Sequence, residues 1–446
     1  MVKNVLILTV GGTPDPLIKS INDIKPDLIY FIPSKQTIHE IEGILKETNF
    51  EGKYEIEELE TGADLKEAYI KSKKIFRNLK EDYNLNADFT GGTKVMVAGF
   101  VLAAVGEDCE FTYVDARTLE GRTKNGVGTV KSGYELIKKQ IDPFNEYAIL
   151  EFNMGKKFFN KYQFKAAEEN FKIAYKKLKD ENLKQLTKIY LKIIKFYDSW
   201  DKFNNHFKNK TTLNKYLEFE ILNEIEYNPY LNEYFTTEEK EFYTQMQDNL
   251  NFLENKISNG KLKIENLHYY LPDLLNNTQR RIEEQKYDDA IARLYRITEL
   301  IAQINLFELD LIHDDEFQDK QKFLIDNEKV KNTYNRYAIE FLEKINSKFD
   351  KNKTSQLGLK NSYKLLKIFN NKIAKEYIDN EDLSDKIAER NVSILAHGIT
   401  AMDEELANEL YEKVYKYSKK TIPKLDDLIK KSKYPKFKDL RIWEQK

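Results

Sequence analysis

The uneven distribution of glycine constrains the fold of this chain more than any other feature of its sequence. Of its 17 glycines, 13 lie before residue 134, and only four are spread over the rest of the 446 residues. Glycine permits the tight turns that connect strands and helices, whereas long segments without it favour uninterrupted helices. We therefore expect a turn-rich N-terminal domain followed by a region made almost wholly of helices.

Short apolar runs alternate with helical patterns in the glycine-rich part. The expected strands lie at 4–10, 27–33, 54–60 and 109–116, and residues 87–90 are expected to end a further strand that precedes the last of these. Longer amphipathic or apolar patterns such as 63–79 and 93–106 lie between them, and a Gly-rich loop or hairpin at 121–133 closes the domain. Strands that alternate with helices predict a mostly parallel, right-handed sheet, so we predict a Rossmann-like α/β domain.

The remainder of the chain is predicted to be all-α. Pro143 marks the change to helical patterns, and a second, softer boundary is expected at 258–272, where Gly260 and Pro272 interrupt the helices. The predicted domains are therefore an α/β domain at 1–142, a helical linker at 143–265 and a second helical domain at 266–446.

Composition excludes several classes of protein. The formal net charge is −2, so any contact with nucleic acid must be local. The single cysteine, Cys109, excludes a disulfide framework and a cysteine-based zinc cluster. The chain has no apolar run of about twenty residues, as a membrane span requires, and its N-terminus lacks the pattern of a signal peptide. We expect a soluble, cytoplasmic protein that does not contact a membrane.

Two glycine loops each follow a strand and begin a helix. They are GGTP at 11–14 and TGGTK at 90–94. In a parallel sheet both lie at the carboxyl edge, where backbone N–H groups and helix N-termini attract anions. Neither loop has the spacing of a dinucleotide-binding or P-loop motif. The pair favours a phosphate-bearing ligand, for which Thr13 and Thr93 supply hydroxyls and Lys94 a charge; the alternative is two tight turns with capped helices.

The stretch RNVSILAHG contains the candidate catalytic residues. Arg390 and His397 are seven residues apart. On a helix that begins near Ser384 and ends at Gly398, they lie on one flank, about 10.5 Å apart along the axis. An imidazole can move a proton to or from a ribose oxygen, and a guanidinium can stabilise charge at phosphorus. Alternatively the two residues form an ordinary structural pair between helices.

Other features of the C-terminal region support less specific hypotheses. Ser393 and His397 have the spacing of a catalytic dyad on a helix, but no third catalytic partner is evident. No cluster of Asp, Glu and His has the spacing of metal ligands. From Lys413 onward, twelve Lys and Arg face four acids, interleaved with aromatic residues. Such a segment can bind single-stranded RNA by charge and stacking, although it is more typical of an amphipathic helix with a solvated face. These aromatic residues are Tyr415, Tyr417, Tyr434, Phe437 and Trp443.

Taken together, these motifs resemble a known family. The strand–GGTP opening, the TGGTK loop and a helical region with RNVSILAH are similar to type III CRISPR-associated ribonucleases, which join a CARF sensor domain to a HEPN nuclease domain. YDDAIARLYRITELIAQ at 287–303 resembles the first HEPN helix. The likeness covers essentially the whole chain in order.

The resemblance implies a homodimer activated by cyclic tetra- or hexa-adenylate. The ring would lie across the two-fold axis, against the positions that match the family's binding loops: Gly11, Gly12, Thr13, Gly91, Gly92, Thr93 and Lys94. Arg390 and His397 would form a composite nuclease site, with Asn391 as an orienting group. The implied reaction is metal-independent cleavage of single-stranded RNA to a 2′,3′-cyclic phosphate and a 5′-hydroxyl, without a cofactor.

Three questions remain open from the sequence. The sensor domain of some family members degrades its own activator, for which Thr13, Thr93 and Lys94 are suitable here. An alternative hypothesis is a ligand-regulated binding protein in which the Arg–His pair is structural. A third hypothesis is an α/β enzyme that processes a nucleotide bound at the glycine loops.

Overall fold

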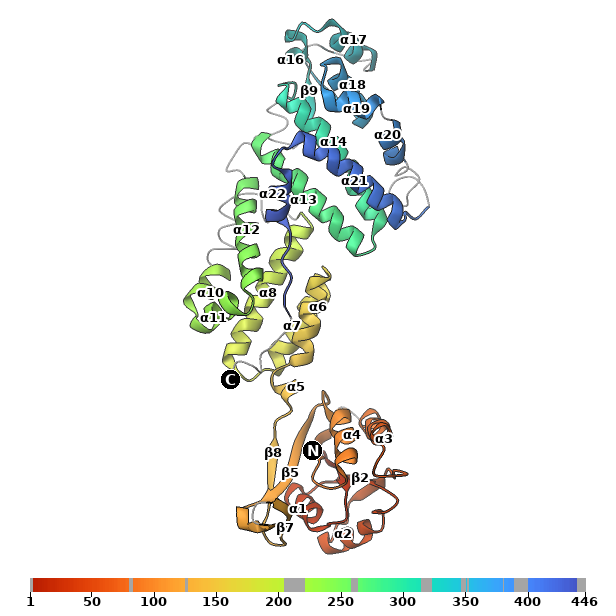
Figure 1. Cartoon of the computed structure of the whole chain (residues 1–446), viewed down its shortest axis with the longest axis vertical. Coiled ribbons are helices and arrows are strands. Elements are labelled where there is room, and N and C mark those ends of the chain that lie inside the picture. The colour runs from red at the N-terminus through yellow and green to blue at the C-terminus, as the bar shows by residue number, and fades with distance from the viewer. Residues whose placement is uncertain are drawn as a thin grey trace. The chain divides into compact units, whose positions relative to one another are not determined.

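The computed structural model describes most of the chain as two compact units. The described residues are 3–79, 83–124, 127–203, 221–257, 264–313, 323–345, 350, 353–379, 381–388 and 400–438. The N-terminal unit comprises Met1–Phe152 with Ile173–Leu183, and the helical unit comprises Asn153–Lys172 with Lys184–Leu440. Figure 1 shows the strands of the first unit and the long helices of the second.

The N-terminal unit is built on a six-stranded sheet in the order β3-β2-β1-β4-β5-β8. The first five strands along the chain are parallel, and β8 is antiparallel to β5. The strands are β1 (Lys3–Val10), β2 (Leu28–Pro33), β3 (Lys53–Ile56), β4 (Tyr83–Asp88), β5 (Cys109–Ala116) and β8 (Glu135–Gln140).

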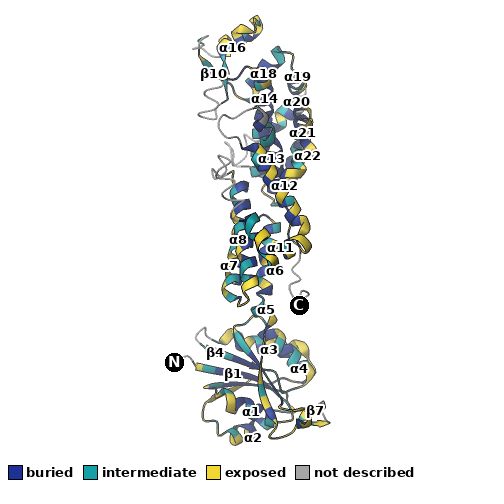
Figure 2. Cartoon of the chain, turned by 90° about the vertical axis from the view of Figure 1, so that its left-hand side faces the viewer, coloured by how far each residue is buried: buried dark blue, intermediate teal, exposed yellow. Residues whose placement is uncertain are grey.

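Helices cover both faces of this sheet. On one face, Val5 and Ile7 of β1 belong to the core of α3 (Leu65–Asn78) and α4 (Lys94–Ala104); on the other, Leu6 and Leu8 belong to the core of α1 and α2. The last two helices are α1 (Asp15–Ile24) and α2 (Glu40–Thr48). Because successive strand residues point to opposite faces, a continuous apolar run can fill both cores. Figure 2 shows the buried sheet between exposed outer helix faces.

The predicted α/β fold is confirmed, with three differences in its strands. β3 ends at Ile56 and is shorter than the predicted 54–60, and β4 (Tyr83–Asp88) ends two residues before the predicted end at 90. The predicted hairpin is present as β6 (Arg122–Lys124) and β7 (Val127–Val130). β8 was not predicted, because its sequence ELIKKQ is polar, as an exposed edge strand tolerates.

The helical unit confirms the all-α prediction for most of the chain after Pro143. Its central helix, α14, is buried along most of its length and packs against α13, α18 and α21. A two-stranded ribbon, β9 (Leu324–Asp326) with β10 (Thr354–Gln356), interrupts the helices. The helices that follow β8 along the chain are α5 (Pro143–Glu146), α6 (Ile149–Asn160), α7 (Phe164–Lys177), α8 (Glu181–Asp201), α10 (Asn223–Tyr227), α11 (Pro229–Thr237), α12 (Lys240–Lys256), α13 (Ile264–Glu283), α14 (Tyr287–Glu308), α16 (Asn327–Asn332), α17 (Arg336–Ile345), α18 (Leu359–Ile368), α19 (Lys372–Asp379), α20 (Glu381–Ala388), α21 (Glu404–Thr421) and α22 (Leu425–Ser432).

The prediction that Pro272 interrupts the helices is wrong. Pro272 lies inside α13, with Leu271 and Leu275 beside it in the core of the helical unit. A proline within a helix removes one backbone hydrogen bond and costs roughly 3 kcal/mol. Burial of the apolar face of α13 against α14 outweighs this cost, so the helix continues.

The segment after α22 (433–438) returns along the helical unit, and its aromatic side chains are buried. Phe437 stacks on Phe242 with ring centroids 4.0 Å apart, and Asn160 bonds both the N–H and the C=O of Phe437. Tyr434 lies against Trp200, 4.9 Å between centroids. Tyr434 and Phe437 are therefore core residues and not stacking platforms for RNA.

A buried ionic cluster joins this segment to α8 and α13. The Asp201 carboxylate accepts from Arg280 Nε at 2.8 Å, from an Arg281 guanidinium nitrogen at 2.7 Å and from Asn277 Nδ2 at 3.0 Å. The Arg280 guanidinium lies over the Tyr434 ring, 3.7 Å from its centroid. Since these charges are nearly excluded from water, each depends on the others for compensation.

We expect Arg280→Ala to destabilise the helical unit strongly. It removes a donor from the buried Asp201 and uncovers the Tyr434 ring, and breaking such a buried pair costs about 3–5 kcal/mol. Lys202→Ala is the matched control, because its ion pair with Asp198 is a surface contact on α8 worth about 0–1 kcal/mol. Urea unfolding followed by circular dichroism measures both; equal losses would contradict the assignment.

Candidate functional site

The two glycine loops lie side by side at the carboxyl edge of the sheet. β1 and β4 are neighbouring parallel strands, with Leu8 opposite Asp88, so the loops that follow them begin at adjacent positions. A Cβ atom added to Gly11 would lie 2.6 Å from the backbone N of Gly92. The structure therefore brings together GGTP and TGGTK, as the sequence predicted.

Different glycines of these loops serve different purposes. A Cβ on Gly91 would lie 2.4 Å from the carbonyl oxygen of Thr9, and Gly92 has a φ of +92°. Only glycine adopts these positions without strain, so both are needed by the fold itself. Gly12, in contrast, is exposed and has no atom within 4 Å of an added Cβ. Its backbone is open to a bound molecule.

Asp88, which was not identified from the sequence, stabilises the start of the TGGTK loop by a hydrogen bond. Its buried carboxylate accepts from Ser20 Oγ at 2.6 Å, from Thr112 Oγ1 at 3.0 Å and from the Thr90 N–H at 2.9 Å. Burial raises the pKa of Asp88, and these hydrogen bonds oppose the rise. The signal in the sequence was a carboxylate placed directly before the TGGTK loop.

The threonines of the two loops are used differently. Thr93 caps α4: its Oγ1 accepts from the Met96 N–H at 3.2 Å and donates to the Gly62 carbonyl. Thr13 does not cap α1, whose N-cap residue is Pro14 and has no side-chain cap bond. Of the two predicted ligand hydroxyls, Thr13 is thus exposed at the edge, and Thr93 already has two partners in the fold.

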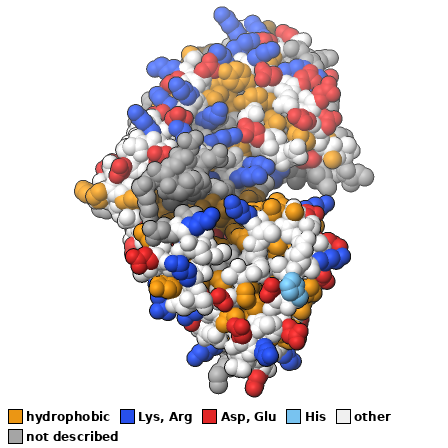
Figure 3. Space-filling view, turned by 60° about the horizontal axis from the view of Figure 1, so that its bottom comes forward, with side chains coloured by type: hydrophobic (Ala, Val, Ile, Leu, Met, Phe, Trp, Pro, Cys, Tyr) orange, Lys and Arg blue, Asp and Glu red, His pale blue; other side chains and the backbone are white. Residues whose placement is uncertain are grey.

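Lys94 supplies a charge at this edge that no acid neutralises. It is exposed, and within the described ranges it forms no ion pair or hydrogen bond. Near the end of β5, Arg122 and Lys138 both contact Asp115, and hydrogen bonds from Lys138 and then Arg122 lower the pKa of Asp115 to about 2. On the face shown in Figure 3, basic and acidic side chains are interspersed, so an anion would be recognised by local groups such as Lys94.

The predicted catalytic residues Arg390, Asn391 and His397 lie outside the described residues. The helix expected to begin near Ser384 is described as α20, from Glu381 to Ala388. Ile387, on its predicted apolar side, is 3% exposed. The structure thus describes the helix that precedes the motif, and the catalytic roles of the three residues stay a prediction.

The described helix that follows the motif is α21 (Glu404–Thr421). Asp403 is its N-cap, with the carboxylate accepting from the Leu406 N–H at 2.9 Å. The basic tail therefore begins as an amphipathic helix, which was the commoner of the two interpretations.

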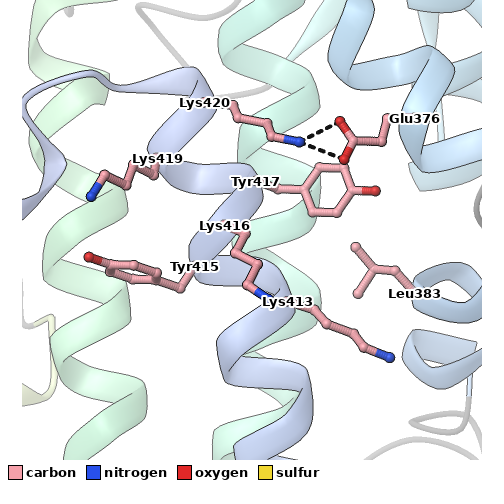
Figure 4. A pocket seen from close by; sticks show the side chains of 8 residues that line it. All are labelled: Glu376, Leu383, Lys413, Tyr415, Lys416, Tyr417, Lys419 and Lys420. Carbon is pink, nitrogen blue, oxygen red and sulfur yellow. Dashed lines mark hydrogen bonds and ion pairs between the residues drawn. The ribbon is translucent and has the colours of Figure 1, made fainter.

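A basic pocket of about 460 Å³ lies between α21, α19 and α20 (Figure 4). Most of its lysines are neutralised. Lys420 contacts both carboxylate oxygens of Glu376 at 2.5 Å, Lys419 pairs with Asp426 at 2.6 Å, and Lys413 pairs with Glu409 at 2.8 Å. Lys416 is exposed and forms no ion pair or hydrogen bond in the described part of the chain.

Other chemical possibilities are limited in the described residues. They contain no group of three or more His, Cys, Asp and Glu side chains placed to hold a metal ion. Burial, with the nearby Asp142 and other acids, raises the pKa of the Cys109 thiol to about 12, so Cys109 is a poor nucleophile. Within the same residues, no helix combines the length and apolar character needed to cross a membrane.

Comparison with known proteins gives one family match and several structural likenesses. Residues 259–421 match the model of the Csm6 HEPN domain family. The structure of Enterococcus italicus Csm6 bound to cyclic hexa-2′-fluoro-hexa-dAMP is similar to 97% of this chain and 99% of that chain, with 13% identity and a TM-score of 0.53. No curated protein sequence matches the chain.

Two further solved structures show only weak overall likeness. One is a type III CRISPR defence DNA nuclease activated by cyclic oligoadenylate, with 14% identity over 45% of this chain and 34% of that chain, and a TM-score of 0.24. The other is Can2 from Sulfobacillus thermosulfidooxidans in complex with cyclic tetra-adenylate, with 12% identity over 45% and 65% of the two chains and a TM-score of 0.23.

These findings confirm the predicted resemblance and fold class. The chain has the architecture of Csm6 from end to end: a mostly parallel α/β domain, then a helical region that contains a HEPN domain. The motif from Arg390 to His397 lies within the matched span of 259–421.

We expect alanine substitution to lower stability at one glycine of the edge and to leave it unchanged at another. Gly91→Ala forces the Thr9 carbonyl and the loop apart, and such overpacking costs about 1–3 kcal/mol. Gly12→Ala meets open space and should leave the unfolding temperature unchanged. Differential scanning fluorimetry compares them; an unchanged Gly91→Ala variant would show that the loop packing is wrong.

Proposed function

We propose that this chain, which has the architecture of the type III CRISPR-associated CARF–HEPN proteins, is an endoribonuclease activated by cyclic oligoadenylate. It would act in antiviral defence by cutting single-stranded RNA without a metal ion. The observation that carries the proposal is the position of R-N-x₅-H, from Arg390 to His397, inside the segment that matches the Csm6 HEPN family.

In the proposed reaction, His397 takes the proton from a ribose 2′-OH. The 2′-oxygen then attacks the adjacent phosphorus, and the bond from phosphorus to the 5′-oxygen breaks. A protonated imidazole returns a proton to this leaving oxygen, and Arg390 stabilises the charge on the phosphate while Asn391 orients it. The products are a 2′,3′-cyclic phosphate and a 5′-hydroxyl.

This reaction needs an acid and a base, whereas each chain has one His at the motif. A homodimer that places two copies of the motif face to face supplies both. We therefore propose a composite nuclease site that forms only in the dimer.

The carboxyl edge of the N-terminal unit is the proposed activator site. A cyclic oligoadenylate is a ring of phosphates, and the edge has an open backbone at Gly12, an exposed hydroxyl at Thr13 and an unpaired charge at Lys94. Gly11, Gly91, Gly92 and Thr93 shape the loops around them. Two copies of this edge would match the symmetry of the ring, and E. italicus Csm6, which shares the fold, was captured with a cyclic hexanucleotide analogue.

We expect His397→Ala to abolish ligand-stimulated RNA cleavage. Loss of a general acid–base group lowers the rate by about 10²–10⁴-fold. The assay is cleavage of a fluorescent single-stranded RNA in EDTA, with cyclic tetra-adenylate, cyclic hexa-adenylate or no ligand. Ser393→Ala is the control and should retain activity, because the proposed reaction does not use the Ser393 hydroxyl.

The same assay separates the alternative functions. No cleavage by the wild type with either ring would favour a ligand-regulated binding protein. Nucleotide turnover that survives loss of Arg390 would favour an α/β enzyme acting at the glycine loops.

We expect Lys94→Ala to weaken activation without harming the nuclease centre. Loss of one charged phosphate contact should raise the activator concentration for half-maximal cleavage about tenfold, equivalent to roughly 1.4 kcal/mol. The maximal rate at saturating activator should be retained. Lys3→Ala is the control, because Lys3 begins β1 at the opposite edge of the sheet; equal shifts in both variants would argue against a site at the glycine loops.

A further inference from the structure

A second pocket of about 680 Å³ borders α20 on the side of α18. Its lining comes from four helices: Tyr295 of α14, Lys360 and Lys364 of α18, Tyr377 of α19 and Asp385 of α20 are among its residues. All of these lie within the helical unit.

The position of this pocket along the chain ties it to the proposed nuclease site. Ile387 of α20 is also part of its lining, and Arg390 follows three residues later. Three residues of even a fully extended chain span at most about 11 Å. The pocket is therefore within reach of a strand of RNA bound at Arg390.

Lys360 and Lys364 carry charge that the fold leaves without a partner. Both are exposed, and neither forms an ion pair or hydrogen bond with any part of the chain that the structure describes. They are four residues apart on one helix, a spacing at which like charges repel and lower helix stability. On the same helix, Lys367 pairs with Asp379 at 2.6 Å. The arrangement costs stability unless an anion binds there.

The helix that carries these lysines has a firm support. Tyr363, between them in the sequence, is 1% exposed and stacks on Tyr377 with ring centroids 3.8 Å apart. The Tyr363 hydroxyl donates to the carbonyl of Thr298 on α14 at 3.0 Å. The two ammonium groups thus project from a fixed backbone, which reduces the entropy lost when they bind.

The charge balance distinguishes this pocket from the one on α21. In the α21 pocket, Lys413, Lys419 and Lys420 are already paired with carboxylates. The α18 pocket has the carboxylate of Asp385 in its lining, against two unpaired lysines, so it retains net positive charge. An anion gains more from the α18 pocket, because it need not displace a carboxylate.

From these observations we infer that Lys360 and Lys364 form a phosphate-binding subsite for the RNA substrate, beside the nuclease motif. The inference rests on the proposed ribonuclease function. The two lysines would contact the backbone of the strand and hold it in the groove bordered by α18 and α20, and they would take no part in the chemical step.

The test uses the full-length protein with His397→Ala, so that RNA is bound and not cut. Binding of a fluorescein-labelled single-stranded RNA is followed by anisotropy with cyclic tetra- or hexa-adenylate present, over a range of salt concentrations. The double variant Lys360→Ala/Lys364→Ala is compared with Lys367→Ala, which removes a lysine of the same helix that is already paired. Unfolding temperatures confirm that the variants are folded.

We expect the double variant to bind RNA at least tenfold more weakly. Each phosphate contact with a single strand contributes about 0.7 to the slope of log K against log salt, so loss of two should reduce the slope by about 1.4. With His397 restored, KM for RNA should rise while kcat is retained. Lys367→Ala should change none of these quantities.

The outcomes distinguish failure of the lysine subsite from failure of the proposed ribonuclease function. If the parent binds RNA and the wild type cleaves it, but the double variant matches Lys367→Ala in affinity and slope, the subsite is overturned and the ribonuclease proposal stands. If the parent binds no RNA and the wild type cleaves none with either ring, both are overturned.

Discussion

The buried carboxylate of Asp201 is the contact on which the helical part of the molecule most depends. It ends α8, and its partners Arg280 and Arg281 lie on α13, while Arg280 in turn supports Tyr434 of the returning C-terminal segment. Three stretches that are far apart in sequence therefore share one charge cluster. The compact unit they form includes both the predicted linker (143–265) and the predicted nuclease domain (266–446) for most of their length. A movement of α8 relative to α13 would expose or unpair these charges, so the two segments are expected to move together.

At the carboxyl edge of the sheet, some loop residues are required by the fold and others are exposed to a ligand. Gly91 and Gly92 are required because a side chain would collide with the Thr9 carbonyl or need a strained backbone. Asp88 and Thr93 are likewise occupied by hydrogen bonds within the fold. What remains for a ligand is the exposed group of Gly12, Thr13 and Lys94. Residues of one motif thus have different physical roles, and only some of them can be expected to contact an activator.

Much of the α/β fold could be predicted, because buried parallel strands leave continuous apolar runs and the strand order then makes the two glycine loops neighbours. All of β8 was missed, since its polar residues are tolerated at the exposed edge of the sheet. Pro272 was misjudged because packing against α14 is invisible in a local pattern. Lys360 and Lys364 had no sequence signal at all: among 72 Lys and Arg, only the lack of a carboxylate in space distinguishes them.

The unpaired charges of Lys360 and Lys364 help to explain how a protein with a net charge of −2 would act on RNA. The total charge is nearly balanced because the chain has 72 Lys and Arg against 74 Asp and Glu, and many lysines of the helical unit pair with an acid, as Lys367 does with Asp379 and Lys420 with Glu376. Paired charges contribute little to the field felt by a phosphate, since each ammonium is offset within a few ångströms. Attraction for a polyanion then arises where pairing fails. In the proposed enzyme, Lys94 at the sheet edge and Lys360 with Lys364 beside α20 are among those places, so unpaired lysines would direct two different nucleic-acid ligands to two different sites.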